Sequence, residues 1–319
     1  MEIFLSILLL VVGMVLLIKG ADWFVEGASS IAKAMKIPSL VIGLTLVSIG
    51  TSAPEFSVSL TSSLQQQIDL SYGNVIGSNI FNTFVVIGVS AIIIPLVVSK
   101  HMQKYDLPIL SGIYLLLGLF SFVVSPGTIV LWESIIIFVL TFIYTAFLII
   151  RSKNEPHEEI VEKKKRKWWI NLILVAVGLA GIIFGGKLVV DNASTLATKF
   201  GMSEKLVGLT IVAIGTSLPE LVTSIVAAKK GENDIAVGNA IGSCIFNVIL
   251  ILGLCSIIEP YKVNLTSDVI DFLVMLASVV VVFIFSLKSK KIVLWHGIVM
   301  VLIYALYLAY IVARNFGIF

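Results

Sequence analysis

The sequence predicts an all-α polytopic membrane protein with about ten transmembrane helices, arranged as two inverted five-helix repeats. Hydrophobic residues make up 58% of the 319 residues and charged residues only 13%, with a mean hydropathy of +1.08, whereas soluble domains carry roughly 25% charged residues. The apolar runs are long enough to cross a bilayer as helices and lack the alternation of barrel strands. In addition, two motifs recur along the chain at one fixed spacing.

The apolar runs predict ten spans in order. We expect them near 3–19, 38–62, 73–97, 107–124, 129–150, 168–190, 205–228, 235–258, 266–287 and 291–313. The first run has no basic residues before it, so we expect a retained span and not a cleaved signal peptide. The two halves are then 1–150 and 168–319, joined by a solvated basic linker at 151–167.

Lysine and arginine gather in the loops after the odd-numbered spans and are sparse after the even-numbered ones. The positive-inside rule therefore predicts a cell-membrane protein whose N-terminus lies outside and whose 151–167 linker lies in the cytoplasm. The basic cluster Lys163–Lys167 adjoins a span, so we interpret it as a topology signal and expect no nucleic-acid partner.

The repeat is carried by two motifs. The first, the proline–glutamate motif Gly50-Thr51-Ser52-Ala53-Pro54-Glu55, recurs as Gly215-Thr216-Ser217-Leu218-Pro219-Glu220, a spacing of 165 residues (220 − 55). The second, the asparagine motif GNVIGSNIFN at 73–82, recurs as GNAIGSCIFN at 238–247, again 165 residues later (247 − 82). An odd number of spans separates the copies, so they enter the membrane from opposite sides as an inverted repeat, which can bring all four motifs together near the midplane.

Polar residues in these motifs predict a cation site. Pro54 and Pro219 interrupt helical hydrogen bonding, and freed carbonyls at membrane depth must line a polar cavity or be buried in protein. We expect Thr51 and Ser52 to share a helix face with Glu55. Carboxylates, hydroxyls, amides and carbonyls are hard oxygen ligands that suit Ca²⁺ and Na⁺, and no His/Cys set suits zinc or copper. An unpaired intramembrane carboxylate is costly, so two in register favour a functional site that holds a cation or, when empty, at least one proton.

These motifs resemble the two alpha-repeats of the sodium/calcium exchangers, in the cation/calcium exchanger superfamily, and especially the compact prokaryotic members. The resemblance implies a central Ca²⁺ site formed by Glu55 and Glu220. The carbonyls of Thr51 and Thr216 would complete that Ca²⁺ site, and Asn82 and Asn247 would lie at its centre. The resemblance also implies flanking Na⁺ sites formed by Ser52, Ser78, Ser217 and Ser243 with the carbonyls of Ser48 and Ala213. It also implies that spans one and six slide as a gating pair.

The favoured function is a secondary antiporter, not an enzyme, that exchanges Na⁺ for Ca²⁺ by alternating access. It needs no cofactor beyond the transported ions, lies in the lipid bilayer and implies no protein partner.

Two alternatives remain: an antiporter that uses H⁺ in place of Na⁺, and a passive cation channel. Gly77 and Gly242 stand where the proton/calcium branch usually has Glu, which disfavours the first, and an inverted repeat around one midplane site disfavours the second. Asn at both 82 and 247 leaves two fixed charges, which predicts no K⁺ requirement, while a third Na⁺ implied by the family would make exchange voltage-sensitive.

Other residues attract weaker hypotheses. Cys244 and Cys255 lie too far apart on one helix to form a disulfide, and we interpret them as packing residues. Glu133, Asp268 and Asp271 lie near span ends and are expected to be wetted or hydrogen-bonded, not ligands. Glu26 and Asp191 align at the 165-residue spacing (191 − 26), with either a gate or a helix cap as their role.

Overall fold

The structure is a computed structural model, and it describes residues 2–66, 68–154, 167–201, 213–265 and 267–315. Within these ranges eight helices are long and apolar enough to cross a membrane, and one further candidate span is a bent pair of helices. The predicted seventh span, 205–228, and the predicted linker, 151–167, lie partly or mostly outside the described residues. The all-α class and the inverted five-helix repeats are confirmed.

The first half contains five spans. They are α1 (Glu2–Met35); a bent span of α2 (Ser39–Ile42), η1 (Gly43–Val47), α3 (Ser48–Thr51) and α4 (Ala53–Leu64); a third of α5 (Ile68–Phe81), η2 (Asn82–Val86) and α6 (Ile87–Ile93); a fourth of η3 (Met102–Asp106), α7 (Leu107–Leu119) and η4 (Phe120–Val124); and α8 (Leu131–Asn154). The η elements are π-helical turns, which are frequently found at functional sites.

The second half repeats this order. It contains α9 (Trp168–Lys199); α11 (Ala213–Gly215) with α12 (Leu218–Lys229); a span of α13 (Asn233–Phe246), η6 (Asn247–Leu252) and α14 (Gly253–Ile258); α15 (Ser267–Ser289); and α16 (Leu294–Asn315). The π-helical turns η2 and η6 begin at Asn82 and Asn247, which are equivalent positions of the two asparagine motifs.

Two predicted span ends are wrong. The first span was expected to end at 19, but α1 continues to Met35, and the sixth was expected to end at 190, but α9 continues to Lys199. Hydropathy detects only the stretch that matches lipid, whereas a helix continues through polar residues wherever protein packs against it. Here the polar end of α1 pairs with the turn after α12, through Lys230 with Asp22 at 2.9 Å and Lys33 with Glu232 at 2.7 Å.

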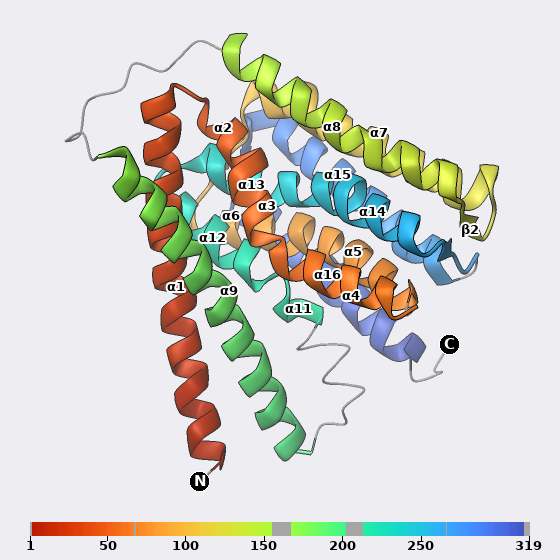
Figure 1. Ribbon diagram of the computed structural model, residues 1–319, viewed down its shortest axis with the longest axis horizontal. Coiled ribbons are helices and arrows are strands. Elements are labelled where there is room, and N and C mark those ends of the chain that lie inside the picture. Colours follow the sequence, from red (N-terminus) through yellow and green to blue (C-terminus); the bar gives the residue numbers. More distant parts are fainter. Residues whose placement is uncertain (1, 67, 155–166, 202–212, 266, 316–319) are drawn as a thin grey trace.

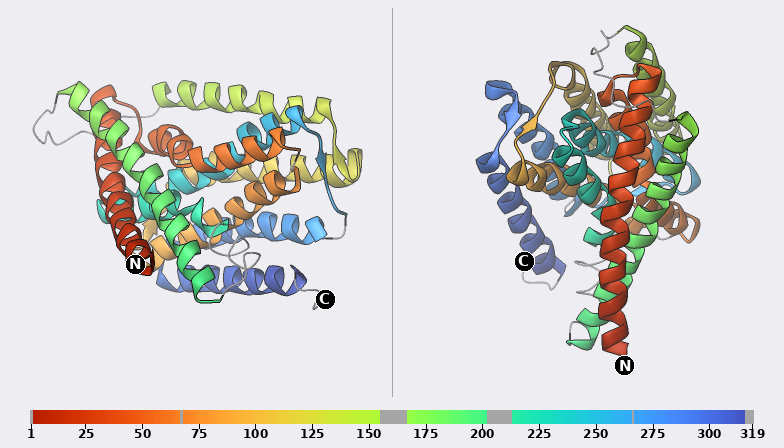
Figure 2. Two further views of the ribbon diagram at one scale, coloured as in Figure 1. Left: turned by 60° about the horizontal axis from the view of Figure 1, so that its bottom comes forward. Right: turned by 90° about the vertical axis from the view of Figure 1, so that its left-hand side faces the viewer.

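Helices α1 and α9 form a closely packed antiparallel pair that crosses the other helices steeply (Figures 1 and 2). Glycines spaced seven residues apart, Gly13, Gly20 and Gly27, face α9. A Cβ on Gly20 would lie 2.7 Å from the carbonyl oxygen of Gly178, and one on Gly27 would lie 2.8 Å from that of Asn171. Small residues of this kind let membrane helices approach at backbone distance. The antiparallel contact is the relation that inverted repeats require of their first helices.

Two short antiparallel strand pairs join the halves. Strand β1 (Leu96–Val97) pairs with β4 (Lys291–Ile292), and β2 (Thr128–Ile129) pairs with β3 (Tyr261–Lys262). β1 is equivalent in sequence to β3 (261 − 96 = 165), and β2 to β4, so each pair joins unlike positions of the two repeats. The loops after spans three and nine therefore lie together, as do the loops after spans four and eight.

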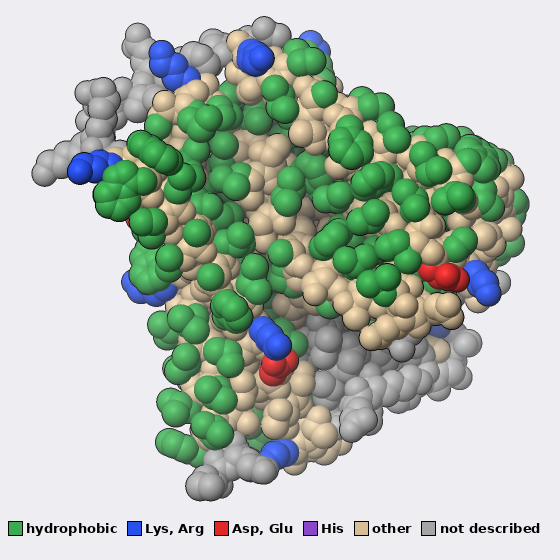
Figure 3. Space-filling view, viewed as in Figure 1, with side chains coloured by type: hydrophobic (Ala, Val, Ile, Leu, Met, Phe, Trp, Pro, Cys, Tyr) green, Lys and Arg blue, Asp and Glu red, His purple; other side chains and the backbone are tan. Residues whose placement is uncertain are grey.

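The outer surface suits lipid. Hydrophobic side chains cover most of the face in Figure 3, and the few charged side chains lie mainly toward its margins. Trp132, Trp168 and Trp295 are half or more exposed and stand at or next to the first residue of a long helix. Tryptophan is enriched where helices leave the hydrocarbon, so these residues mark membrane interfaces.

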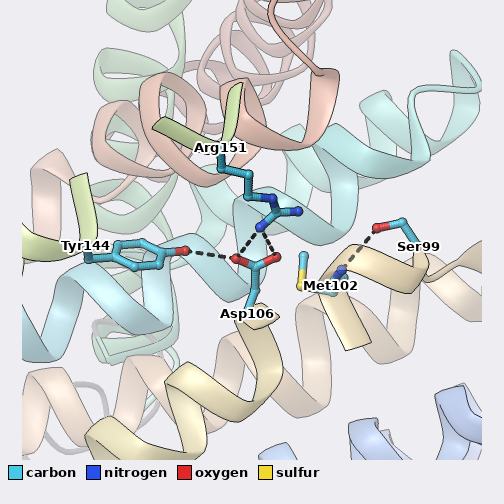
Figure 4. Close-up of polar contacts among 5 residues, drawn as sticks. All are labelled: Ser99, Met102, Asp106, Tyr144 and Arg151. Atoms are coloured by element: carbon cyan, nitrogen blue, oxygen red, sulfur yellow. Dashed lines mark hydrogen bonds and ion pairs between the residues drawn. The ribbon is translucent and has the colours of Figure 1, made fainter. Parts of the chain in front are cut away.

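A buried ion pair ties the fourth span to the fifth. Arg151, near the end of α8, donates to both carboxylate oxygens of Asp106 at 2.9 Å, and the Tyr144 hydroxyl lies 3.4 Å from Asp106 Oδ1 (Figure 4). The second half repeats this cluster. Asp271 (106 + 165) accepts from Arg314 (151 + 163) at 2.9 Å and from Tyr307 (144 + 163) at 3.2 Å. Neither Asp106 nor Arg151 was predicted to pair from the sequence.

Candidate cation-binding site

Each proline–glutamate motif breaks its span and starts a new helix. The first half of the bent span ends at Thr51, Ser52 adopts φ −79° and ψ 8°, and α4 starts at Ala53 with a bend of 50°. In the second half Ser217 stands at the same break, and α12 starts at Leu218. Proline is tolerated in a first helical turn because that position donates no intrahelical hydrogen bond.

Glu55 and Glu220 occupy the first turns of α4 and α12. The N-terminus of a helix carries partial positive charge, which stabilises an anion there. Both carboxylates are fully buried. Among the described residues, neither forms an ion pair with Lys, Arg or His, so helix ends and hydroxyl groups are what balance their charge.

The two carboxylates are held by hydroxyls from the opposite half. Ser52 Oγ donates to Glu220 Oε1 at 2.9 Å, and Ser217 Oγ donates to Glu55 Oε1 at 2.9 Å. Thr51, Ser52 and Glu55 all contact the other repeat, as a shared face predicts, although the 50° bend at Ser52 separates Thr51 from the helix that carries Glu55. Thr51 Oγ1 donates to Asn239 Oδ1 at 2.9 Å.

The remaining predicted serines join the same cluster. Ser78 Oγ lies 3.2 Å from Ser217 Oγ. Ser243 Oγ lies 3.4 Å from Glu220 Oε1 and 3.4 Å from the carbonyl oxygen of Ser48. All four serines and Ser48 are buried.

Several buried oxygens of the site have no hydrogen-bond partner among the described residues. They are Oε2 of Glu55, Oε2 of Glu220, Oδ1 of Asn82 and Oδ1 of Asn247. The π-helical turn that begins at Asn82 packs against α12, and the one that begins at Asn247 packs against α4. Each asparagine thus lies beside the helix that carries the glutamate of the other half. An unsatisfied buried polar atom costs about 1–3 kcal/mol, and these four oxygen atoms together form a set that a cation could bind.

Two asparagines with no predicted role support the glutamate backbones. Asn74 Nδ2 donates to the carbonyl oxygen of Glu55 at 3.2 Å and to Ser59 Oγ at 2.9 Å. Asn239 Nδ2 makes the equivalent bonds to the carbonyl oxygen of Glu220 and to Ser224 Oγ at the same two distances. Their position in the repeated asparagine motif was the sequence signal that could have identified them.

The predicted carbonyl ligands differ in surroundings. The carbonyl oxygen of Ser48 accepts from Ser52 N at 3.0 Å and lies 3.3 Å from Thr51 Oγ1 and 3.4 Å from Ser243 Oγ. Ala213 begins α11, and Thr216 lies beside the break in the second half. Their roles as ligands stay predictions.

The acidic residues outside the motifs have partners of their own. Glu133 Oε2 accepts from Val130 N at 2.9 Å, Asp268 Oδ2 accepts from Asn264 N at 2.8 Å, and Asp271 pairs with Arg314. Glu26 lies 3.7 Å from Lys230, and Asp191 is exposed on α9. None of these joins the carboxylate pair. Among the described residues no three His, Cys, Asp or Glu side chains cluster as a metal site, which leaves the two glutamates with amide and hydroxyl oxygens.

The comparisons with known proteins agree on one family. The family described as sodium/calcium exchanger protein matches residues 5–150 and 170–313, which together span both repeats. The chain belongs to this family. It is a multi-pass membrane transporter of the exchanger type, and the family is not one of enzymes.

Named relatives cover almost the whole chain. A putative antiporter, CaxA of Alkalimonas amylolytica, is 38% identical over 88% of this chain and 89% of its own length. The sodium/calcium exchanger MaX1 of Methanosarcina acetivorans is 33% identical over 95% of this chain and 97% of its own. Among solved structures, the sodium–calcium exchanger NCX_Mj soaked with 10 mM Na⁺ and zero Ca²⁺ aligns with a TM-score of 0.84 and 32% identity, over 96% of this chain and 99% of that one.

Proposed function

We propose that this protein exchanges Na⁺ for Ca²⁺ across a cell membrane, and that both ions use the cluster around Glu55 and Glu220. The observation that carries the proposal is a set of four oxygens, from two carboxylates and two amides, that are buried where the halves meet and have no hydrogen-bond partner in the described part of the chain. A divalent cation neutralises two carboxylates, and amide and carboxylate oxygens are the ligands that Ca²⁺ prefers.

Sodium suits the periphery of the same cluster. The hydroxyls of Ser52 and Ser243 lie at Glu220, and those of Ser217 and Ser78 lie at Glu55, so each carboxylate is approached by one serine from each repeat. Neutral hydroxyl and carbonyl oxygens can coordinate a monovalent hard cation without excess negative charge. Because both kinds of ion would need the same carboxylates, they would compete, and that competition is the basis of exchange.

The inverted repeat supports alternating access. Two halves related by a two-fold axis in the membrane plane can adopt each other's conformation, which moves a fixed midplane site from one side to the other. The α1–α9 pair meets the rest of the protein as a separate layer, and the family resemblance implies that this pair slides. The relative named sodium/calcium exchanger MaX1 and the NCX_Mj structures support Na⁺ as the coupling ion.

The test is uptake of radioactive Ca²⁺ into proteoliposomes. We expect an outward Na⁺ gradient to drive uptake, and Glu55→Gln and Glu220→Gln to reduce it to the level of protein-free vesicles, because each removes one charge that a divalent ion needs. Glu133→Gln is the matched control: Glu133 is also fully buried but only caps Val130, and glutamine can still accept that hydrogen bond.

The two alternative functions, a proton-coupled antiporter and a channel, predict different results. Uptake that follows a pH gradient with Na⁺ absent on both sides would establish proton coupling instead. Single-channel openings in planar bilayers would establish a channel. Wild-type uptake by both glutamine variants would overturn the site itself.

A further inference from the structure

The two asparagine motifs differ at one position of the site, and the difference lies where the halves meet. Asn79 in the first motif corresponds to Cys244 in the second (244 − 79 = 165), and both are fully buried. The two residues contact each other: Asn79 Nδ2 donates to the carbonyl oxygen of Cys244 at 3.3 Å, and Cys244 Sγ lies 3.6 Å from the carbonyl oxygen of Asn79. One half therefore places an amide at this junction and the other a thiol.

The backbone of Cys244 determines which way the Asn79 amide points. A carbonyl oxygen only accepts hydrogen bonds, so the Asn79 group beside it must be the NH₂, and Oδ1 must point the other way. Asn247 Nδ2 donates to that Oδ1 at 3.1 Å. An amide oxygen accepts and never donates, so Asn247 must present its NH₂ there as well, which leaves its own Oδ1 without a partner among the described residues.

Asn82 has no such arrangement. The residue equivalent to Asn79 on its side is Cys244, which has no amide, and whose Sγ lies 3.5 Å from Thr83 Oγ1. Asn82 is fully buried, and neither its Nδ2 nor its Oδ1 has a hydrogen-bond partner within the described part of the chain. Nothing there favours one orientation of this amide over the other.

We propose that Asn79 is a positioning residue that locks the amide of Asn247 with its oxygen available to a cation, while Asn82, opposite Cys244, can turn over. The inference rests on the proposed function, since it assigns Asn247 Oδ1 to a bound ion. A pre-oriented ligand binds more tightly because its conformational entropy is lost on folding and not on binding. The lock also selects an amide at 247, because an aspartate there would set a carboxylate oxygen against the oxygen of Asn79.

The structure allows a test in which the positioning asparagine is transferred from position 79 to position 244 while the amino-acid composition stays the same. The double variant Asn79→Cys with Cys244→Asn exchanges the two residues, so it should free Asn247 and lock Asn82. In the parent, Asn247→Leu should raise the Ca²⁺ concentration for half-maximal uptake about three- to tenfold more than Asn82→Leu does. In the exchanged background the order should reverse.

A reversed order is a result that a merely structural role for Asn79 would not produce, since the exchange keeps both side chains and their volumes. An unchanged order in the exchanged background, or equal losses for the two leucine variants in the parent, would overturn the lock. If the exchanged variant does not fold, Asn79→Leu is the deciding variant. A higher Ca²⁺ concentration for half-maximal uptake with an unaltered maximal rate supports the lock, and an unaltered concentration refutes it.

The closing measurement separates this inference from the proposed function. Thermal unfolding in detergent is recorded with Ca²⁺, Na⁺ or neither for all variants. If the parent shows no Na⁺-driven Ca²⁺ uptake, the proposed exchange fails. The two leucine variants are then ranked by how much each reduces the rise in melting temperature that the bound cation produces. If exchange is normal but the order does not reverse, the lock alone fails.

Discussion

Two serine hydroxyls at the helix breaks connect the halves through the carboxylates they contact. Ser52 belongs to the first repeat but donates to Glu220 of the second, and Ser217 does the reverse, each at 2.9 Å. A hydrogen bond to a charged group contributes roughly 1.5–3 kcal/mol, and the same oxygen can turn to coordinate a monovalent cation. Under the proposed function, these hydroxyls would bind Na⁺ while Na⁺ and Ca²⁺ compete for the carboxylates.

At this scale we expect Ser52→Ala and Ser217→Ala to weaken Na⁺ binding more than Ca²⁺ binding. The Na⁺ concentration that gives half-maximal exchange should rise about tenfold, the equivalent of about 1.4 kcal/mol, with a smaller change for Ca²⁺, because the carboxylates that dominate Ca²⁺ binding remain. Ser57→Ala, on the exposed side of α4, is the matched control and should behave as the parent. Equal losses for both ions would contradict a separate role of the hydroxyls in Na⁺ binding.

At the scale of the elements, ion pairs hold adjacent helices together in both halves. The pair in the first half is buried, with exposed side-chain fractions of 0% for Asp106 and 7% for Arg151. The equivalent pair in the second half is wetter, at 14% for Asp271 and 25% for Arg314. Burial decides the consequence of breaking a pair, because an unpaired charge in a dry environment finds no water to replace its partner.

Asp106→Asn should therefore destabilise the protein more than Asp271→Asn does. Removing one partner of a buried pair costs about 3–5 kcal/mol, which a lowered melting temperature in detergent would report. The double variant Asp106→Leu with Arg151→Met should recover most of the loss, because it removes both charges and keeps apolar volume. If the double variant is as unstable as Asp106→Asn, the ion pair itself stabilises the protein, and the loss in Asp106→Asn does not come only from leaving Arg151 unpaired.

For the whole molecule, the strand pairs join the loops that inverted symmetry requires on a common face. β1 with β4 joins the loops after spans three and nine, and β2 with β3 joins those after spans four and eight. The first pair of loops is lysine-rich and the second is lysine-poor, so the charge pattern predicts which face is cytoplasmic.

We expect a cysteine at Lys100 to be labelled from the cytoplasm and one at Lys262 from outside, by an impermeant maleimide in intact cells and inverted vesicles. Both lysines are exposed, whereas Cys244 and Cys255 are buried, so the unsubstituted parent is the control for background labelling. Reversed labelling would place the N-terminus inside. Labelling of both positions from one side would contradict the assignment of the strand pairs to opposite faces.

The class, the repeat and the site composition followed from the sequence alone. Apolar runs long enough to cross a bilayer, without the alternation of barrel strands, indicate spanning helices, because lipid offers backbone groups no hydrogen bonds. The duplicated motifs, separated by an odd number of spans, required an inverted repeat. Two intramembrane glutamates without basic neighbours are enough to predict a cation site at Glu55 and Glu220.

Only the tertiary structure shows which side chains of one half contact which side chains of the other. Sequence spacing placed Ser52 and Glu55 on one face, but it could not show that the Ser52 hydroxyl contacts Glu220 of the other half. The Asp106–Arg151 pair and the Asn79–Asn247 bond join residues 45 and 168 positions apart, and no local pattern encodes such contacts. Hydropathy likewise ended α1 sixteen residues early, at 19 where the helix ends at 35 (35 − 19), because it records preference for lipid and not packing against protein. The local sequence determines which segments span the membrane and which side chains can bind a cation, whereas the contacts between those side chains depend on how the whole chain folds.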